Sequence, residues 1–225
     1  MSKRRQPLKG MKVFFSASVP ECLENQAQEK LVDLMVLARW LFAAGGEIVY
    51  GGHPSITPVI HQCAQQTGVS SNRIHLFQLR RFRHMAPEEI WDPEVFSKIH
   101  WIGDGDRSLA EELGTMRDAM AEASHAAVFM GGKRGPGGIR DEYERFLSRH
   151  GTRRPMYLLG FLDGLSKDLI EEHEKAGTRE PNGLAPRDLA FIRHNKTMEI
   201  IAPLIIGDMA RYGARSEPAT GKWER

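Results

Sequence analysis

The stretch AAVFMGGKRGPGG, residues 126–138, carries the strongest structural signal of the chain. Its first part is an apolar run of the kind that forms a buried strand, and its second part is rich in glycine. Glycine lacks a Cβ atom, so the backbone can turn sharply there and approach a ligand closely. A helix that begins after such a turn directs free N–H groups and a partial positive charge at that ligand. The stretch therefore predicts a strand–turn–helix unit that can bind an anion.

A second stretch, EIVYGGHPSIT at residues 47–57, has the same organisation. A short strand-like run precedes Gly51 and Gly52, and apolar residues at helical spacing follow from Ile56 to Ala64. Two turns of this kind in one chain suggest a site for a phosphorylated ligand.

The rest of the chain alternates between strand-like runs and amphipathic helical segments. This alternation predicts an α/β, Rossmann-like three-layer fold with a mostly parallel sheet and additional C-terminal helices. Ligands of such sheets bind beyond the carboxyl ends of the strands, where both glycine turns lie. The expected strands are residues 12–18, 47–50, 73–79, 98–102, 126–130 and 155–159.

Two features interrupt this pattern. Residues 80–97 begin with Arg80, Arg81 and Arg83, and they predict a long connection that is either functional or an insertion. The arginines could reach a second phosphate or a partner, but a solvated basic loop is the simpler interpretation. Pro203 should kink or split the last helical segment.

The expected boundaries are a single domain over residues 11–211, with its core at 11–159 and a helical extension at 160–211, and flexible tails at 1–10 and 212–225.

Composition narrows the class of partner. The chain has 225 residues, and its 31 Lys and Arg residues against 29 Asp and Glu give a formal charge of only +2. This balance is too small to argue for nucleic-acid binding, and no nucleic-acid partner is expected. No run reaches membrane-spanning or signal-peptide length, and Cys22 and Cys63 lack metal-ligand spacing. We therefore expect a cytoplasmic protein with no membrane partner, no metal and no cofactor.

Several residues near the second turn form a recognisable order. A helical segment containing Arg117 precedes the strand, the paired glycines Gly131 and Gly132 follow it, and then come Gly138 and Glu142. This order resembles the core of the SLOG superfamily, which includes the LOG phosphoribohydrolases and sensor-type domains such as those of DprA and TRPM. The resemblance covers residues 11–159. It implies a Rossmann-like fold and a nucleotide or nucleotide-derived ligand.

The resemblance also implies roles for two residues. In LOG enzymes the residues that correspond to Arg117 and Glu142 act on the N-glycosidic bond of a nucleoside monophosphate. Three departures weaken the enzyme motif: Met130 replaces a proline, Ile139 replaces a threonine, and the loop is longer by the basic residues 133–134. The chain is therefore more similar to the sensor-type branches, which bind nucleotide-derived signals in stress and conflict systems. A nucleotide N-glycosidase is the alternative.

Each candidate residue has a structural alternative. Arg117 could form a rim salt bridge, and Glu142 could interact with the helix dipole, a role that Asp141 would serve equally. Ser16 could be needed for packing, His53 could shape its turn, and Lys133 could be solvated. The candidate catalytic pair is Arg117 and Glu142, and the candidate ligand-binding residues are Ser16, Gly51, Gly52, His53, Gly131, Gly132, Lys133, Gly137 and Gly138.

A cluster near the C-terminus suggests self-association. Ile200, Ile201, Leu204 and Ile205 lie close together in the last helical segment. The chain is therefore expected to form a homo-oligomer.

Overall fold

The computed structural model describes residues 6–19, 27–53, 56–83 and 98–216. Six strands form one sheet in the order β4-β3-β2-β1-β5-β6, and every neighbouring pair is parallel. The strands are β1 Lys12–Ser18, β2 Glu47–Tyr50, β3 Ile74–Leu79, β4 Lys98–Ile102, β5 Ala126–Gly131 and β6 Met156–Leu159. The helices are α1 Ala27–Ala43, α2 Thr57–Thr67, α3 Leu109–Ala123, α4 Gly138–His150, α5 Leu165–Ala176, α6 Pro186–His194 and α7 Met198–Ser216, with 3-10 turns η2 Ser71–Arg73, η3 Arg80–Phe82 and η5 Gly160–Leu162.

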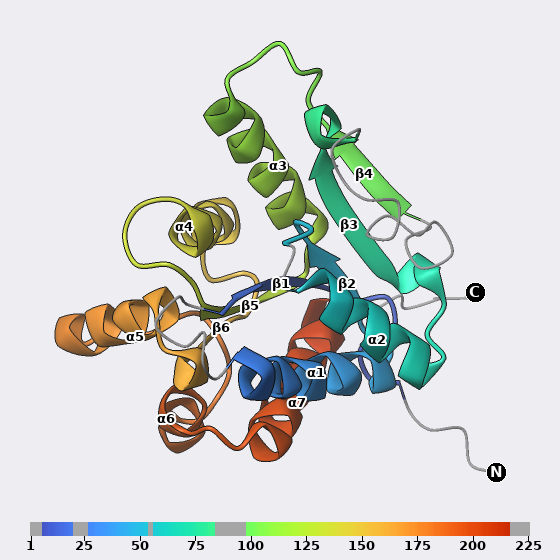
Figure 1. Ribbon diagram of the computed structural model, residues 1–225. Coiled ribbons are helices and arrows are strands. Elements are labelled where there is room, and N and C mark those ends of the chain that lie inside the picture. The colour runs from blue at the N-terminus through green and yellow to red at the C-terminus, as the bar shows by residue number, and fades with distance from the viewer. Residues whose placement is uncertain (1–5, 20–26, 54–55, 84–97, 217–225) are drawn as a thin grey trace, which may run out of the picture.

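The sheet is the middle of three layers (Figure 1). Helices α3, α4 and α5 pack on one face, and α1, α2, α6 and α7 pack on the other. Alternate residues of β1 serve the two faces: Phe14 belongs to the core beneath α3 and α4, whereas Val13 and Phe15 belong to the core beneath α1 and α7. A sheet buried on both faces explains why its strands are almost continuously apolar. The predicted fold class is confirmed.

The strand order reverses between β1 and β5. From β1 the chain runs through β2 and β3 to β4 at one edge, and then returns to the other side of β1 for β5 and β6. The connections that leave β1 and β5 therefore run in opposite directions, which opens a crevice at the carboxyl ends of these two strands. This topology determines where a ligand can enter.

Local signals in the sequence account for several boundaries. Helix α3 begins with a capping box, in which the Ser108 side chain accepts from the Glu111 amide and the Glu111 side chain accepts from the Ser108 amide. Helix α2 ends at Gly68, whose left-handed conformation (φ 61°) closes the last turn. Cys63 is buried inside α2, in the apolar stripe that runs from Ile56 to Ala64.

The C-terminal segment completes the main core. Ile201 and Ile205 are buried against α1, so most of the expected oligomerisation cluster is core, and only Ile200 is strongly exposed, at 51%. Of the two effects expected of Pro203, a kink or a split, the split is wrong, because α7 continues through this residue and the break falls at residues 195–197 instead. The burial of Ile201 and Ile205 compensates for the one backbone hydrogen bond that proline removes.

Both expected tails are partly folded. Leu8 is buried, and its N–H donates to the Ala44 carbonyl at 2.9 Å. Helix α7 reaches Ser216 rather than ending near residue 211. Residues 1–5 and 217–225, like residues 84–97 of the expected long connection, lie outside the described part of the chain. Among the described residues, no helix is long and apolar enough to cross a membrane.

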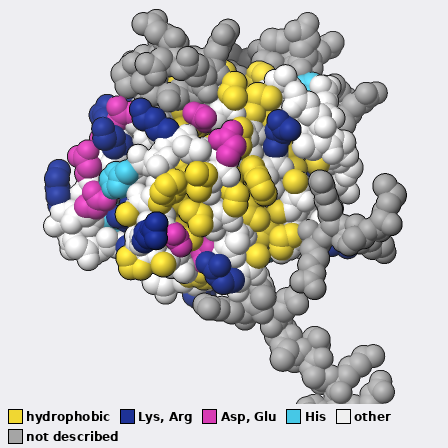
Figure 2. Space-filling view, turned by 90° about the horizontal axis from the view of Figure 1, so that it is seen from below, with side chains coloured by type: hydrophobic (Ala, Val, Ile, Leu, Met, Phe, Trp, Pro, Cys, Tyr) yellow, Lys and Arg dark blue, Asp and Glu magenta, His cyan; other side chains and the backbone are white. Residues whose placement is uncertain are grey.

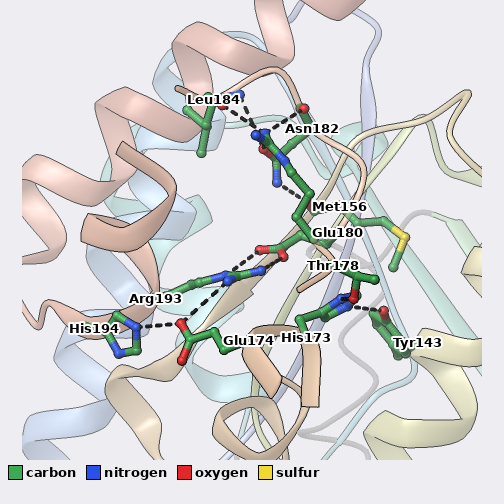
Figure 3. Close-up of polar contacts among 11 residues, drawn as sticks. Tyr143, Met156, His173, Glu174, Thr178, Glu180, Asn182, Leu184, Arg193 and His194 are labelled. Atoms are coloured by element: carbon green, nitrogen blue, oxygen red, sulfur yellow. Dashed lines mark hydrogen bonds and ion pairs between the residues drawn. The ribbon is translucent and has the colours of Figure 1, made fainter. Parts of the chain in front are cut away.

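A buried ion pair ties the segment after α5 to α6 (Figure 3). The Arg193 guanidinium bonds to the carboxylate of Glu180, which is fully buried, and it also lies 3.5 Å from Glu174. Beside this pair, the His173 ring bonds to the Tyr143 hydroxyl at 2.7 Å and to the Thr178 hydroxyl at 2.8 Å. These contacts attach α5 to α4 and hold the segment between α5 and α6 in place.

Candidate functional site

A cavity of about 630 Å³ lies at the carboxyl ends of β1, β2 and β3. Ser16 and Ser18 of β1, Gly51 after β2 and Gln78 of β3 contribute to its wall. The opposite wall comes from α3 and from the first two turns of α4. This is the crevice that the reversal of strand order creates, so topology and cavity agree on one place.

The first glycine turn forms one edge of this cavity. Gly51, Gly52 and His53 line it, and Gly52 has a positive φ of 68° that favours glycine. The His53 carbonyl accepts from both the amide and the hydroxyl of Thr57, at 3.0 and 3.1 Å, which starts α2. Pro54 and Ser55 of this turn lie outside the described residues.

The second glycine turn requires glycine for steric reasons. Gly132 has φ 92°, and a Cβ atom built there would lie 2.9 Å from Cδ1 of Ile139. The Gly132 amide donates to the Ser18 carbonyl at 3.0 Å, which holds the turn against β1. Gly138 lines the cavity, whereas Gly131, Gly132 and Gly137 shape the turn behind it and are not part of the wall.

Arg117 and Glu142 meet in the cavity. Arg117 Nε lies 3.7 Å from Glu142 Oε1, and both side chains line the cavity wall. Glu142 Oε2 accepts a 2.5 Å hydrogen bond from the Ser16 hydroxyl. Arg117 Nε is buried and makes no hydrogen bond to any described residue. The three side chains come from α3, α4 and β1, so only the tertiary fold brings them together.

An ion-pair chain behind the cavity positions the arginine. Arg117 Nη1 donates to Asp141 Oδ2 at 2.8 Å, and the other Asp141 oxygen accepts from Arg145 Nε at 2.7 Å. Arg145 in turn donates to Asp118 at 2.7 Å. Arg117 therefore combines two arrangements: it forms a salt bridge with Asp141 at the rim, and it also lines the cavity.

Comparison with known families identifies this architecture. Residues 27–184, which include both glycine turns and both α3 and α4, match the SLOG cluster3 family. The chain belongs to the SLOG cluster3 family. The expected membership of the SLOG superfamily is thereby confirmed.

A solved structure supports the fold. The crystal structure of TM1055, from the Northeast Structural Genomics Consortium, is similar with a TM-score of 0.55 and 15% sequence identity. The similarity covers 87% of this chain and 98% of TM1055. A comparison with curated proteins found no match.

Burial makes the Glu142 carboxylate of this SLOG domain unusual. Burial raises the pKa of Glu142 above its ordinary value, and the Ser16 hydrogen bond and the Arg117 charge oppose this rise. Glu142 is the fifth residue of α4, and Asp141 is the acidic residue of the first turn. Interaction with the helix dipole therefore accounts for Asp141 better than for Glu142.

The two basic residues of the second turn, Lys133 and Arg134, lie in different surroundings. Lys133 lines the cavity. Arg134 turns toward α5, where it donates to Asp168 at 3.0 Å and to Asp163 at 2.9 Å. A phosphate contact is therefore available to Lys133 but is not supported for Arg134.

In the basic run after β3, the Arg81 side chain is bonded within the protein and does not extend into solvent. Its guanidinium donates to the buried carboxylate of Glu112 at 2.5 Å and to the Arg107 carbonyl at 2.5 Å. The Arg83 guanidinium lies over the Trp101 ring, 5.8 Å from its centroid. These contacts fix the turn that follows β3.

Several wall residues of the SLOG cavity were not identified from the sequence. Their common feature is apolar or neutral character, which reasoning about glycine turns and charges overlooks. Gln78 carried a usable signal, since it is the one polar residue near the carboxyl end of a buried strand. The wall residues that were not among the candidate site residues are Phe14, Phe15, Ala17, Tyr50, Ile56, Gln78, Phe82, Leu113, Met116 and Ile139.

Proposed function

We propose that this SLOG domain binds a nucleotide or nucleotide-derived small molecule and acts as a sensor of it. The observation that carries the proposal is the meeting of Arg117, Glu142 and Ser16 in one cavity between the two glycine turns. A cavity of about 630 Å³ has the size of a small-molecule site.

The phosphate end of the ligand is assigned to the second turn. Gly138 begins α4 and lines the cavity, so the positive end of the helix dipole would face an anion bound there. Lys133 adds a cation on the same side. Arg117 supplies a further donor, because its buried Nε has no hydrogen-bond partner among the described residues.

Two features favour binding without turnover. Both oxygens of Glu142 are engaged, one by the Ser16 hydroxyl and one by the Arg117 charge. Ile139 places an apolar side chain in the cavity wall at a position where a hydroxyl would otherwise contact phosphate. A site that holds its carboxylate in such contacts is suited to recognition of the ligand.

Calorimetry with the whole chain tests the proposal. A panel of nucleoside monophosphates, diphosphates and dinucleotides should include at least one that binds, and Arg117→Met should weaken its binding at least about tenfold. Arg149→Met is the matched control, because Arg149 of α4 also pairs with a carboxylate, that of Glu122 on α3, but does not line the cavity. Absence of binding by the whole panel would refute the proposal.

A second candidate function is hydrolysis of an N-glycosidic bond. The observation that favours it is the short distance between the Arg117 guanidinium and the Glu142 carboxylate, which can orient a ribose and stabilise developing positive charge. Release of free base from the bound nucleotide, followed by chromatography, measures this activity. Glu142→Gln should abolish it, and equal activity in this variant would eliminate the mechanism.

We also propose that the domain self-associates through the face formed by α1 and α7. Figure 2 looks onto this side of the molecule and shows hydrophobic side chains gathered there. Val32 and Trp40 of α1 are 57% and 41% exposed. Arg39 and Glu199 line the adjacent groove, so a two-fold arrangement of two copies would pair opposite charges across the apolar contact.

Sedimentation tests this surface directly. The wild-type chain should sediment as a dimer at micromolar concentration, and Trp40→Glu should make it a monomer. Leu109→Glu is the control, since Leu109 is 42% exposed on α3, on the other face of the sheet. A wild-type monomer at 100-fold higher concentration would contradict the proposal.

A further inference from the structure

Gln78 is a buried polar residue in the cavity wall, and its place in the sheet separates it from the charged groups. It lies in β3, two strands from β1, so at a spacing of about 4.8 Å per strand it is roughly 10 Å from the Ser16 side of the cavity. Only 8% of the residue is exposed. Gln78 therefore lies at the far end of the cavity from Lys133 and Gly138.

The orientation of the Gln78 amide is determined by a backbone contact. The Leu79 N–H donates to Gln78 Oε1 at 2.8 Å. Only the oxygen of a carboxamide can accept this bond, so the assignment of oxygen and nitrogen is fixed. The bond from the Leu79 amide is the one hydrogen bond that the Gln78 side chain makes to the described residues, and Gln78 Nε2 takes no part in it. The group that Gln78 offers to the cavity is therefore a hydrogen-bond donor.

An aromatic ring accompanies this donor. Phe82, in the 3-10 turn directly after β3, lines the same cavity. The turn is held in place because the neighbouring Arg81 is bonded to the buried Glu112 carboxylate. An aromatic ring and a fixed donor in the wall of one cavity suit a planar heterocycle with an acceptor on its edge.

We propose that Gln78 is the residue that selects the base of the bound nucleotide, and that it favours a base carrying an oxo group over one carrying an amino group. The inference rests on the proposed function, since it assumes a nucleotide with its phosphate at the second glycine turn. An oxo oxygen accepts from Gln78 Nε2, whereas an exocyclic amino group places a second donor against it and leaves both unpaired.

Matched nucleotide pairs and one isosteric variant test this selection. IMP and AMP, like UMP and CMP, share ribose and phosphate but carry an oxo or an amino group on the ring. Calorimetry with the whole chain should give roughly tenfold tighter binding of the oxo member of each pair. Gln78→Glu can still accept from the Leu79 amide with one oxygen while it replaces the donor by an acceptor. At pH 8 this variant should reverse the preference.

The controls separate the possible failures. Gln78→Met removes the donor and should remove the preference without reversing it, and thermal melting of both variants establishes that they are folded. If nucleotides bind but the oxo-to-amino ratio of the wild type is below about twofold, or is the same in Gln78→Glu, the selection is refuted while nucleotide binding stands. If none of the four nucleotides binds the wild type, this selection is refuted, and the wider panel decides whether the domain binds nucleotides at all.

Discussion

Replacement of Gly132 by alanine should destabilise the domain strongly, and the structure allows the cost to be worked out. The residue has φ 92°, a backbone conformation that costs an L-residue about 1–2 kcal/mol. Its new Cβ atom would lie 2.9 Å from Cδ1 and 3.1 Å from Cβ and Cγ1 of Ile139, which is itself buried. Overpacking of this kind adds roughly 1–3 kcal/mol. We expect a total loss of about 3 kcal/mol in the free energy of unfolding.

Two further variants divide this cost into its parts. Gly135→Ala in the same loop has φ 105° but no atom within 4 Å of the new Cβ, so it should show the backbone cost alone. Ile139→Ala removes Cδ1, the nearest clashing atom, together with Cγ1, and leaves only Cβ at 3.1 Å, so the double variant Gly132→Ala, Ile139→Ala should lose less stability than the sum of the single variants.

Urea unfolding gives the free energies, and thermal melting should show a decrease in Tm of roughly 6–12 °C for Gly132→Ala at about 2–4 °C per kcal/mol. Equal losses for Gly132→Ala and Gly135→Ala, or strict additivity with Ile139→Ala, would refute the steric argument.

Two other predictions concern buried charges. Because burial raises the folded-state pKa of Glu142 above the ordinary value of 4.5, the wild type should lose stability relative to Glu142→Gln as the pH rises above 4.5. The difference in Tm between the two proteins, measured from pH 4 to pH 8 by differential scanning fluorimetry, should grow with pH, and a constant difference would contradict this. Arg193→Met should cost about 3–5 kcal/mol because it leaves the fully buried Glu180 carboxylate unpaired. The double variant Arg193→Met, Glu180→Leu should recover most of this loss in urea unfolding, and no recovery would contradict the argument.

The sequence was sufficient for the strands and the fold class. Buried parallel strands such as Glu47–Tyr50 are short apolar runs between turn residues, and their predicted limits coincide with those of the structure or differ by one residue. Helix starts with a local cause, such as the capping box at Ser108, could also be predicted. The C-terminal segment could not, because Ile201 and Ile205 have the same apolar character whether they face the core or a partner chain.

The candidate site was predictable only in part, because some of its features are local in sequence and others depend on tertiary contacts. Glycine turns are local features, so Gly51, Gly52 and Gly138 could be placed at the carboxyl edge of the sheet from sequence alone. The pairing of Arg134 with Asp163 and Asp168 depends on α5, which lies about 30 residues further along the chain, and no local pattern reveals it. Whether a loop cation faces a ligand or a neighbouring helix is decided by tertiary packing.

The site concentrates features that cost stability in the absence of a ligand. Glu142 is a partly buried carboxylate with a raised pKa, and Arg117 Nε is a buried donor without a hydrogen-bond partner among the described residues. An anionic ligand that accepts from Arg117 would satisfy this donor and neutralise part of the positive charge at the helix start. Such a ligand binds only the folded chain, so at 100 times its dissociation constant it should raise the free energy of unfolding by about 2.7 kcal/mol. Ligand binding should therefore be measurable as thermal stabilisation, and Arg117→Met should remove most of this stabilisation.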